Sequence, residues 1–230
     1  MSRTPTFLNT PERKSTPWRS TPKTAKDLLG DIFAELPGVL AELDDLRCAE
    51  DAQAKEMQRR LLLRKCSVLE RDWLRWGRES APERDPVIAP ETVPAAQMLD
   101  HLVAAHIMST YWAIGIYLHA TLDEVACSGE QALRAIPSDS YDEAMMCCRN
   151  ILAITPTFLS CHAGEFGVHG AIFGSIVALH YLNSFAGRLA SPEERAFRDL
   201  FARNANGKIV ERFVDNMLQG IRKCGVELFP

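Results

Sequence analysis

Apolar residues recur at steps of three and four along most of this chain, which is the spacing of one face of an α-helix. The pattern begins at Leu28 and runs through Leu36 to Leu46, and Pro37 and Gly38 interrupt it. A proline is tolerated in the first turn of a helix but removes a hydrogen bond inside one. The sequence therefore predicts a kink or two short helices here.

A long amphipathic helix is predicted over residues 54–78. Its apolar stripe consists of Met57, Leu61, Leu62, Cys66, Leu69, Trp73 and Trp76. Arginines and lysines occupy the other faces, and four acids are interspersed among them, Glu56, Glu70, Asp72 and Glu79. This mixture favours a solvated face over a surface for DNA or membrane, and the tryptophans are expected to be core anchors. The stripe could also pair with its copy in a second chain.

Two runs, residues 102–122 and 166–187, contain no Asp, Glu, Lys or Arg. Each is long enough to cross a bilayer, which takes about 20 apolar residues. Histidines, serines and glycines interrupt both runs, so we expect buried central helices of a helical domain rather than membrane spans.

The remaining periodic segments are also helical. One helix is predicted from Tyr141 to about Thr155, and two more follow the cap-like Ser191-Pro192, with a turn at residues 204–207 between them. The four prolines of residues 80–94 indicate a surface loop, and no strand-like alternation is sustained. The predicted fold class is all-α, a single multi-helix domain of about seven or eight antiparallel helices over residues 24–230.

The N-terminal residues 1–23 differ from the rest, because they hold four Thr-Pro pairs and few apolar side chains. Such a segment cannot bury enough surface to offset the entropy of ordering, so a disordered basic tail is expected. Residues 1–26 contain six Lys or Arg and one Glu, whereas the formal charge of the whole chain is −4. An acidic body is a poor surface for nucleic acid, because phosphate binding needs clustered cations.

The seven cysteines are scattered and odd in number, which favours reduced thiols over a disulfide framework. The opening residues lack the apolar segment of a secretory leader. Together these observations lead us to expect a location in the nucleus or, as the alternative, the cytoplasm.

The densest group of ligand-type residues is the segment CHAGEFGVH, residues 161–169. Its spacing matches no zinc motif, and its glycines, with Gly170, favour an irregular turn between helices over a metal site. No metal and no cofactor is expected. His101, His106 and His119 cannot share one helix face, so hydrogen-bonded core or boundary positions are expected for them.

No nucleophile elbow, phosphate-binding loop or paired carboxylates are present, so no catalytic residue is assigned. A cyclase or isomerase that works by holding its substrate in a shaped cavity would leave no such motif. Polar and aromatic groups near the apolar runs are the candidates for lining a ligand pocket. They are His106, Tyr111, Trp112, His162, Glu165 and His169.

Several segments together resemble a known family. They are LPGVLAELDDL, LLLRKCSVLERDWLRW, HIMSTYWAIGIYLHATL, YDEAMMCCRNILAI with a GEFG turn, and GAIFGSIVALHYL. In their order they resemble the C-terminal regulatory region of fungal-specific transcription factors, over most of residues 25–220. The resemblance implies an all-helical regulatory module, which in full-length members follows a binuclear zinc cluster that binds DNA. That cluster needs six cysteines, and residues 1–47 contain none.

Two functions are therefore open at this stage. The first is a transcription regulator-like protein that modulates a gene cluster, such as one for secondary metabolism, by binding an effector or a partner. Its partner could be a small molecule, a second copy or a zinc-cluster transcription factor, with no sequence-specific DNA binding of its own and no membrane. The alternative is an enzyme or ligand-binding accessory of a biosynthetic pathway that uses a helical pocket.

Overall fold

A computed structural model of the chain describes residues 10–82, 94–127, 139–185 and 191–223. These residues form helices and contain no strand, so the predicted all-α class is confirmed. Contacts divide the chain into two compact units, Met1–Ala81 with Tyr117–Asp142 and Pro82–Ile116 with Glu143–Pro230.

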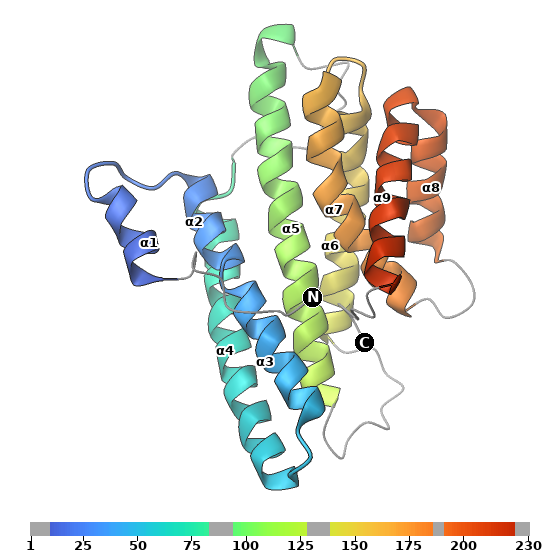
Figure 1. Cartoon of the computed structure of the whole chain (residues 1–230). Coiled ribbons are helices and arrows are strands. Elements are labelled where there is room, and N and C mark those ends of the chain that lie inside the picture. Colours follow the sequence, from blue (N-terminus) through green and yellow to red (C-terminus); the bar gives the residue numbers. More distant parts are fainter. Residues whose placement is uncertain (1–9, 83–93, 128–138, 186–190, 224–230) are drawn as a thin grey trace. The chain divides into compact units, whose positions relative to one another are not determined.

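The first unit is built on helix α4 (Ala52–Glu79), against which α2 (Ala25–Phe33) and α3 (Leu36–Cys48) both pack (Figure 1). Pro37 lies in the first turn of α3, where its missing amide leaves no hydrogen bond unmade. The two short helices predicted around this proline are therefore confirmed. Thr24 begins α2 with a capping box.

The inner side of α4 carries the core of this unit. Its buried residues are Leu62, Cys66, Leu69, Trp73 and Trp76. The indole nitrogen of Trp76 donates a hydrogen bond of 2.8 Å to the carbonyl oxygen of Ala25, which ties α4 to the start of α2. The predicted long helix is confirmed, but its stripe was drawn too wide, since Met57 is 62% and Leu61 56% exposed.

The segment before α2 is ordered where the sequence predicted disorder. Residues 10–23 form a short helix, α1 (Pro11–Ser15), followed by a 3₁₀ turn, η2 (Thr16–Trp18). Lys14 pairs with Glu35, and the ammonium of Lys23 lies 5.9 Å from the ring centroid of Trp18. Lys23 also pairs with Asp31 of α2, so ion pairs join the segment to the body of the unit, and residues 10–23 are ordered where disorder was expected. Residues 1–9 lie outside the described residues.

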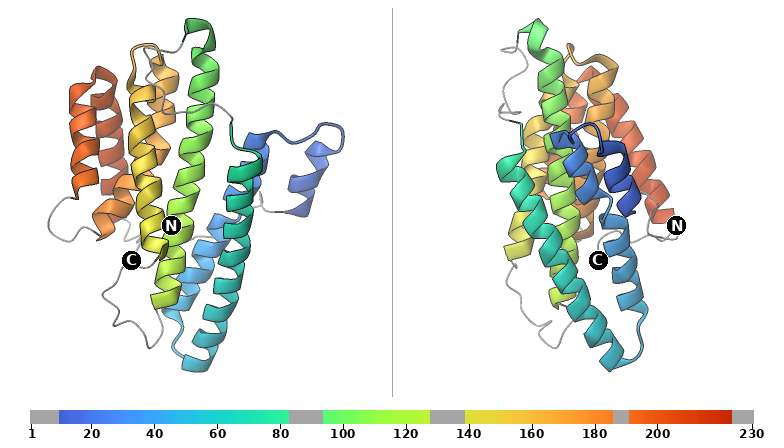
Figure 2. Two further views of the ribbon diagram at one scale, coloured as in Figure 1. Left: turned by 180° about the vertical axis from the view of Figure 1, so that it is seen from behind. Right: turned by 90° about the vertical axis from the view of Figure 1, so that its left-hand side faces the viewer.

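The second unit contains most of α6 (Asp139–Leu159) and all of α7 (Gly164–Phe185), α8 (Pro192–Arg203) and α9 (Ala205–Lys223). Helices α7, α8 and α9 pack side by side (Figure 2). The hydroxyl of Ser191 accepts a hydrogen bond from the amide of Glu194, so the predicted cap of α8 is confirmed.

The glycine-rich turn before α7 is shorter than predicted. Gly164, at a φ of 54°, begins the helix, whereas Gly167 and Gly170 lie inside it. A Cβ atom on Gly167 would stand 2.1 Å from the carbonyl oxygen of Phe158, and one on Gly170 would stand 2.8 Å from the Phe158 ring. These two glycines therefore allow α7 to approach the end of α6, and the prediction of an irregular turn at their positions was wrong.

The link between α8 and α9 is likewise tighter than the predicted turn at residues 204–207. Only Asn204 separates the two helices, and Gly207 lies in the first turn of α9. A Cβ atom at Gly207 would stand 2.3 Å from the carbonyl oxygen of Phe201, so this glycine also serves a close helix contact.

Helix α5 (Met98–Cys127) contributes residues to both units and contains the first uncharged run. Its residues Ala113, Ile114, Ile116 and Leu118 have no exposed surface, so the expectation of a buried helix is confirmed. None of the helices formed by the described residues combines the length and apolarity needed to cross a membrane. Of the loop predicted at residues 80–94, residues 83–93 lie outside the described residues.

Candidate functional site

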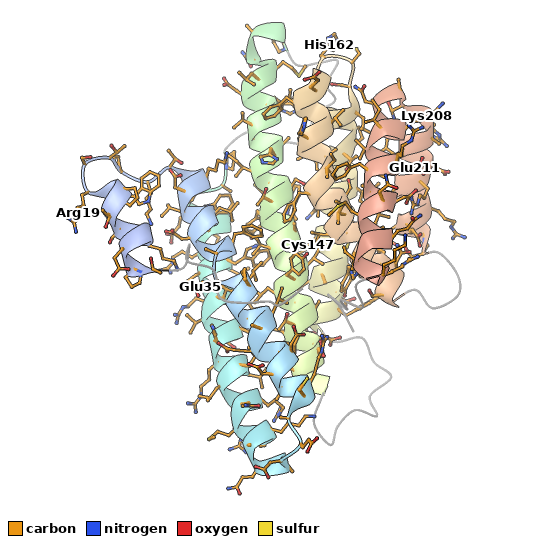
Figure 3. All side chains as sticks on the ribbon, in the orientation of Figure 1. Arg19, Glu35, Cys147, His162, Lys208 and Glu211 are labelled. Carbon is orange, nitrogen blue, oxygen red and sulfur yellow. The ribbon has the colours of Figure 1, made fainter. Side chains whose placement is uncertain are left out.

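The six residues predicted to line a pocket lie on three elements of the second unit. His106, Tyr111 and Trp112 are on α5, His162 is in the turn between α6 and α7, and Glu165 and His169 are on α7. Figure 3 shows His162 at the end of the α6–α7 pair. His162, Glu165 and His169 are exposed, whereas Tyr111 is buried.

One contact brings part of this set together. The ring of His106 meets the ring of Phe166 edge to face, with centroids 6.4 Å apart. Phe166 follows Glu165 in the first turn of α7, and the Nδ1 of His169 donates a hydrogen bond of 2.8 Å to the backbone carbonyl of Glu165. The side chain of Phe166, which sequence reasoning did not select, is thus the link between α5 and the predicted α7 residues.

Tyr111 belongs to the core instead. Burial raises the pKa of its hydroxyl well above the ordinary value, and the neighbouring Cys147 and Glu143 of α6 add to the rise. Cys147 is itself buried, and burial with Glu143 raises the pKa of its thiol to about 12. Tyr111 therefore has the surroundings of a packing residue between α5 and α6, apart from the exposed histidines.

The ligand-type residues that the structure describes do not form a metal site. Across residues 10–82, 94–127, 139–185 and 191–223, no three His, Cys, Asp or Glu side chains are placed to hold a metal ion. The buried histidines are not hydrogen-bonded as expected: His101 Nε2 and both ring nitrogens of His119 have no hydrogen-bond partner among the described atoms. The predicted place of His101 and His119 in the core is confirmed, but the hydrogen bonds predicted for these ring nitrogens are absent from the part of the chain that the structure describes.

A different surface, which the sequence did not single out, lies at the start of α4 in the first unit. An open depression of about 630 Å³ is located there. The described residues that line it are Asp51, Gln53, Ala54, Glu56, Met57, Arg60, Leu61 and Arg64. Apolar side chains, two arginines and two acids meet at this depression, so it can take an apolar group with polar or charged groups beside it.

The depression continues into a longer exposed surface, which we call the α4 outer face. It consists of Met57, Arg60, Leu61, Arg64, Val68, Arg71, Leu74, Arg75 and Arg78. All nine side chains are exposed and lie on the side of α4 opposite its buried tryptophans. At 1.5 Å per residue, this face is roughly 30 Å long.

The acids that the sequence intersperses with these arginines are mostly paired or half-buried, and Glu79 alone among them is exposed, at the end of the helix. Glu56 receives hydrogen bonds from both Arg59 and Arg60, which lower the pKa of its carboxyl to about 2. Glu70 and Asp72 are both half-buried. The predicted solvated face is thus present, and between residues 57 and 78 it carries exposed arginines and no exposed acid.

A second exposed apolar stripe lies on α9. Ile209, Phe213 and Met217, spaced by four residues, are 58%, 45% and 44% exposed. The acids of this helix face elsewhere, since Glu211 and Asp215 both pair with Arg198 of α8. Figure 3 shows Lys208 and Glu211 on α9. The second unit thus also presents a row of apolar side chains to solvent on one helix.

Comparisons of the chain with protein-family models, with curated proteins and with solved structures found no match.

Proposed function

We propose that this chain is a regulator-like protein that acts by binding a macromolecular partner and thereby modulates transcription. The single observation that carries the proposal is the α4 outer face, where apolar and cationic side chains are exposed together along one helix. Isolated exposed apolar residues are normal on a protein surface, but Met57 and Leu61 lie one turn apart beside a depression, and such a grouping is typical of an interaction site.

The energetics of α4 support the same function. Met57, Leu61, Val68 and Leu74 are 45–62% exposed, and these side chains would be more stable out of water. The arginines beside them can bury their aliphatic stems while their guanidinium groups form charged hydrogen bonds, which makes arginine frequent in binding sites. A partner that covers this face would thus gain both apolar contact and ion pairs.

The transcriptional part of the proposal rests on the sequence resemblance. In the family that the chain resembles, a helical regulatory region accompanies a zinc cluster that binds DNA. We therefore assign the influence on transcription to a partner protein that carries such a cluster, and the nucleus is then the expected location. The same resemblance extends the proposal to control of a gene cluster, such as one for secondary metabolism.

A reporter experiment tests this function. The chain is fused to a heterologous DNA-binding domain in a fungal cell, and expression of a reporter gene downstream of its operator is measured. We expect a change in reporter expression that is lost in the Leu61→Asp variant. The matched control is Ala202→Asp on α8, another exposed helix position outside both apolar stripes, which should behave as the unsubstituted chain does.

Equal reporter expression with and without the fused chain would contradict a role in transcription. If a small molecule instead co-purifies with the native chain and is lost in the His106→Ala variant, the ligand-binding alternative replaces the proposal. The contact of His106 with Phe166 makes this variant the relevant one.

A further inference from the structure

We propose that the α4 outer face binds an acidic amphipathic helix of a partner protein. This inference rests on the proposed function, because it names the class of partner that the regulator would bind. It follows from the spacing, the charge and the shape of this face.

The spacing is that of a helix-binding seam. Seven exposed side chains recur at alternating steps of four and three residues along α4, namely Met57, Leu61, Arg64, Val68, Arg71, Arg75 and Arg78. Steps of this kind keep side chains on one line along a helix that packs lengthwise on another helix. A partner helix laid along this line would contact apolar groups near the start of α4 and guanidinium groups toward its end.

The charge specifies what that partner carries. Arg60 and Arg75 each pair with a carboxylate of α4 itself, Glu56 and Asp72. The other arginines of this face, Arg64, Arg71 and Arg78, form no ion pair with any residue that the structure describes. A partner with glutamate or aspartate beside its apolar seam would supply the missing carboxylates, and arginine binds carboxylates with two parallel hydrogen bonds.

The same charge argues against a second copy of this chain. Two α4 outer faces laid together would bring arginines against arginines or against apolar side chains along most of their length, because the exposed acids Asp51 and Glu79 lie only at the two ends. Like charges in register are unfavourable and are a common way in which helices reject a wrong partner. The self-pairing that the sequence left open is therefore not the arrangement that this face favours.

The shape favours a protein helix over a membrane. The depression of about 630 Å³ at Met57 and Leu61 can receive a protruding apolar side chain, whereas a bilayer presents no such projection. A helix that lies on a membrane turns a broad apolar face toward the lipid with cations at its margins. In α4 the broad apolar face is buried in the fold, and arginines occupy the middle of the exposed one.

A peptide-binding measurement tests the inference on the full chain. The probe is a fluorescein-labelled helical peptide of about three heptads, with leucine at a and d and glutamate at e and g. The comparison peptide has glutamine in place of every glutamate. Fluorescence anisotropy should show binding of the acidic peptide that weakens steeply as salt is added, and binding of the glutamine peptide that is about tenfold weaker or absent.

The variant Arg64→Glu/Arg71→Glu reverses two exposed charges. We expect it to weaken binding of the acidic peptide by about tenfold or more and to bind a peptide with lysine in place of glutamate instead. The matched control, Arg195→Glu/Arg212→Glu, reverses two exposed arginines of α8 and α9 and should bind the acidic peptide as the unsubstituted chain does. Circular dichroism of each variant shows whether its helices are retained, and recovery of binding with the lysine peptide shows that the outer face of α4 is still formed.

Three results would overturn the inference. They are equal binding of the acidic and glutamine peptides, equal binding by the charge-reversed variant and the unsubstituted chain, and binding to phosphatidylserine vesicles without binding to the peptide. The inference and the proposed function can fail separately. If the acidic peptide binds but reporter expression does not change, only the transcriptional role is refuted. If the reporter effect persists in the Arg64→Glu/Arg71→Glu variant, only the acidic helix as partner is refuted.

Discussion

A buried histidine makes the stability of the first unit dependent on pH. His119 of α5 is 3% exposed, and its ring meets that of Trp73 edge to face at 5.4 Å between centroids. Burial lowers the pKa of His119 from 6.5 to about 4. The imidazole is therefore neutral in the folded chain at pH values where it binds a proton in the unfolded chain.

The magnitude follows from this shift. Stability is complete above the unfolded pKa of 6.5 and is lost as the pH falls toward the folded pKa, because only the unfolded state gains a proton in that window. At 1.4 kcal/mol per pKa unit the full loss is about 3 kcal/mol, and about 2 kcal/mol of it is reached near pH 5.

The perturbation is His119→Leu, which removes the titrating ring and keeps an apolar side chain at the site. Urea unfolding is measured for the native chain and the variant between about pH 8 and pH 5, and the difference between their free energies of unfolding is followed. Groups that titrate in both proteins cancel in this difference, so it should shift by about 2 kcal/mol in favour of the variant at the acid end.

The carboxylate of Glu70 provides the control. Its Oε1 lies 3.8 Å from the Nδ1 of His119, a distance that would form an ion pair if the imidazole were protonated. Burial dominates over this attraction, so Glu70→Gln should leave the pH dependence close to that of the native chain. A difference between the native chain and His119→Leu that does not change from pH 8 to pH 5 would refute the reasoning.

Further predictions concern packing and thiol reactivity. Gly167→Ala should lower the free energy of unfolding by about 1–3 kcal/mol, because the added methyl group collides with the backbone of α6. Gly30→Ala on α2 should raise the free energy of unfolding by about 0.5–1 kcal/mol, because nothing lies within 4 Å of the added methyl group. Thermal unfolding of the two variants measures this contrast, and destabilisation by both would contradict it. Iodoacetamide should modify exposed Cys48 and Cys161 well before buried Cys147, whose pKa is raised to about 12 by burial and Glu143. Mass spectrometry gives the order, and early labelling of Cys147 would show that α6 is not packed as described.

The helices could be predicted from sequence because their signals are local. The proline of α3 and the serine cap of α8 act within one turn of chain, so their effects did not depend on the rest of the fold. The interior positions of Gly167 and Gly207 could not be predicted in this way. Both glycines are needed for close contact with residues of another helix, and in the sequence such glycines look the same as turn glycines.

The surface of α4 shows a second limit of sequence reasoning. Met57 and Leu61 continue the apolar spacing of the buried residues, but at 3.6 residues per turn a stripe of that width covers more than one side of the helix. The sequence likewise does not show which arginines pair with acids of the same helix, as Arg60 and Arg75 do, and which stay exposed without an ion pair to a described residue. The candidate residues near the uncharged runs were chosen by chemistry alone. Among them the structure shows a hydrogen bond of His169 to the backbone of Glu165, and a contact of His106 with Phe166, which was not a candidate.

Photo-crosslinking from α4 tests the central claim most directly. A benzophenone amino acid replaces Leu61 in the depression, and in a second protein it replaces Ala202 on α8 as the control. After irradiation in the cells that produce the chain, crosslinked peptides are identified by mass spectrometry. The account predicts a crosslink from position 61 to an acidic amphipathic segment of another protein and no such product from position 202. Crosslinks from position 61 only to lipid, only to a second copy of the chain, or to nothing would contradict it.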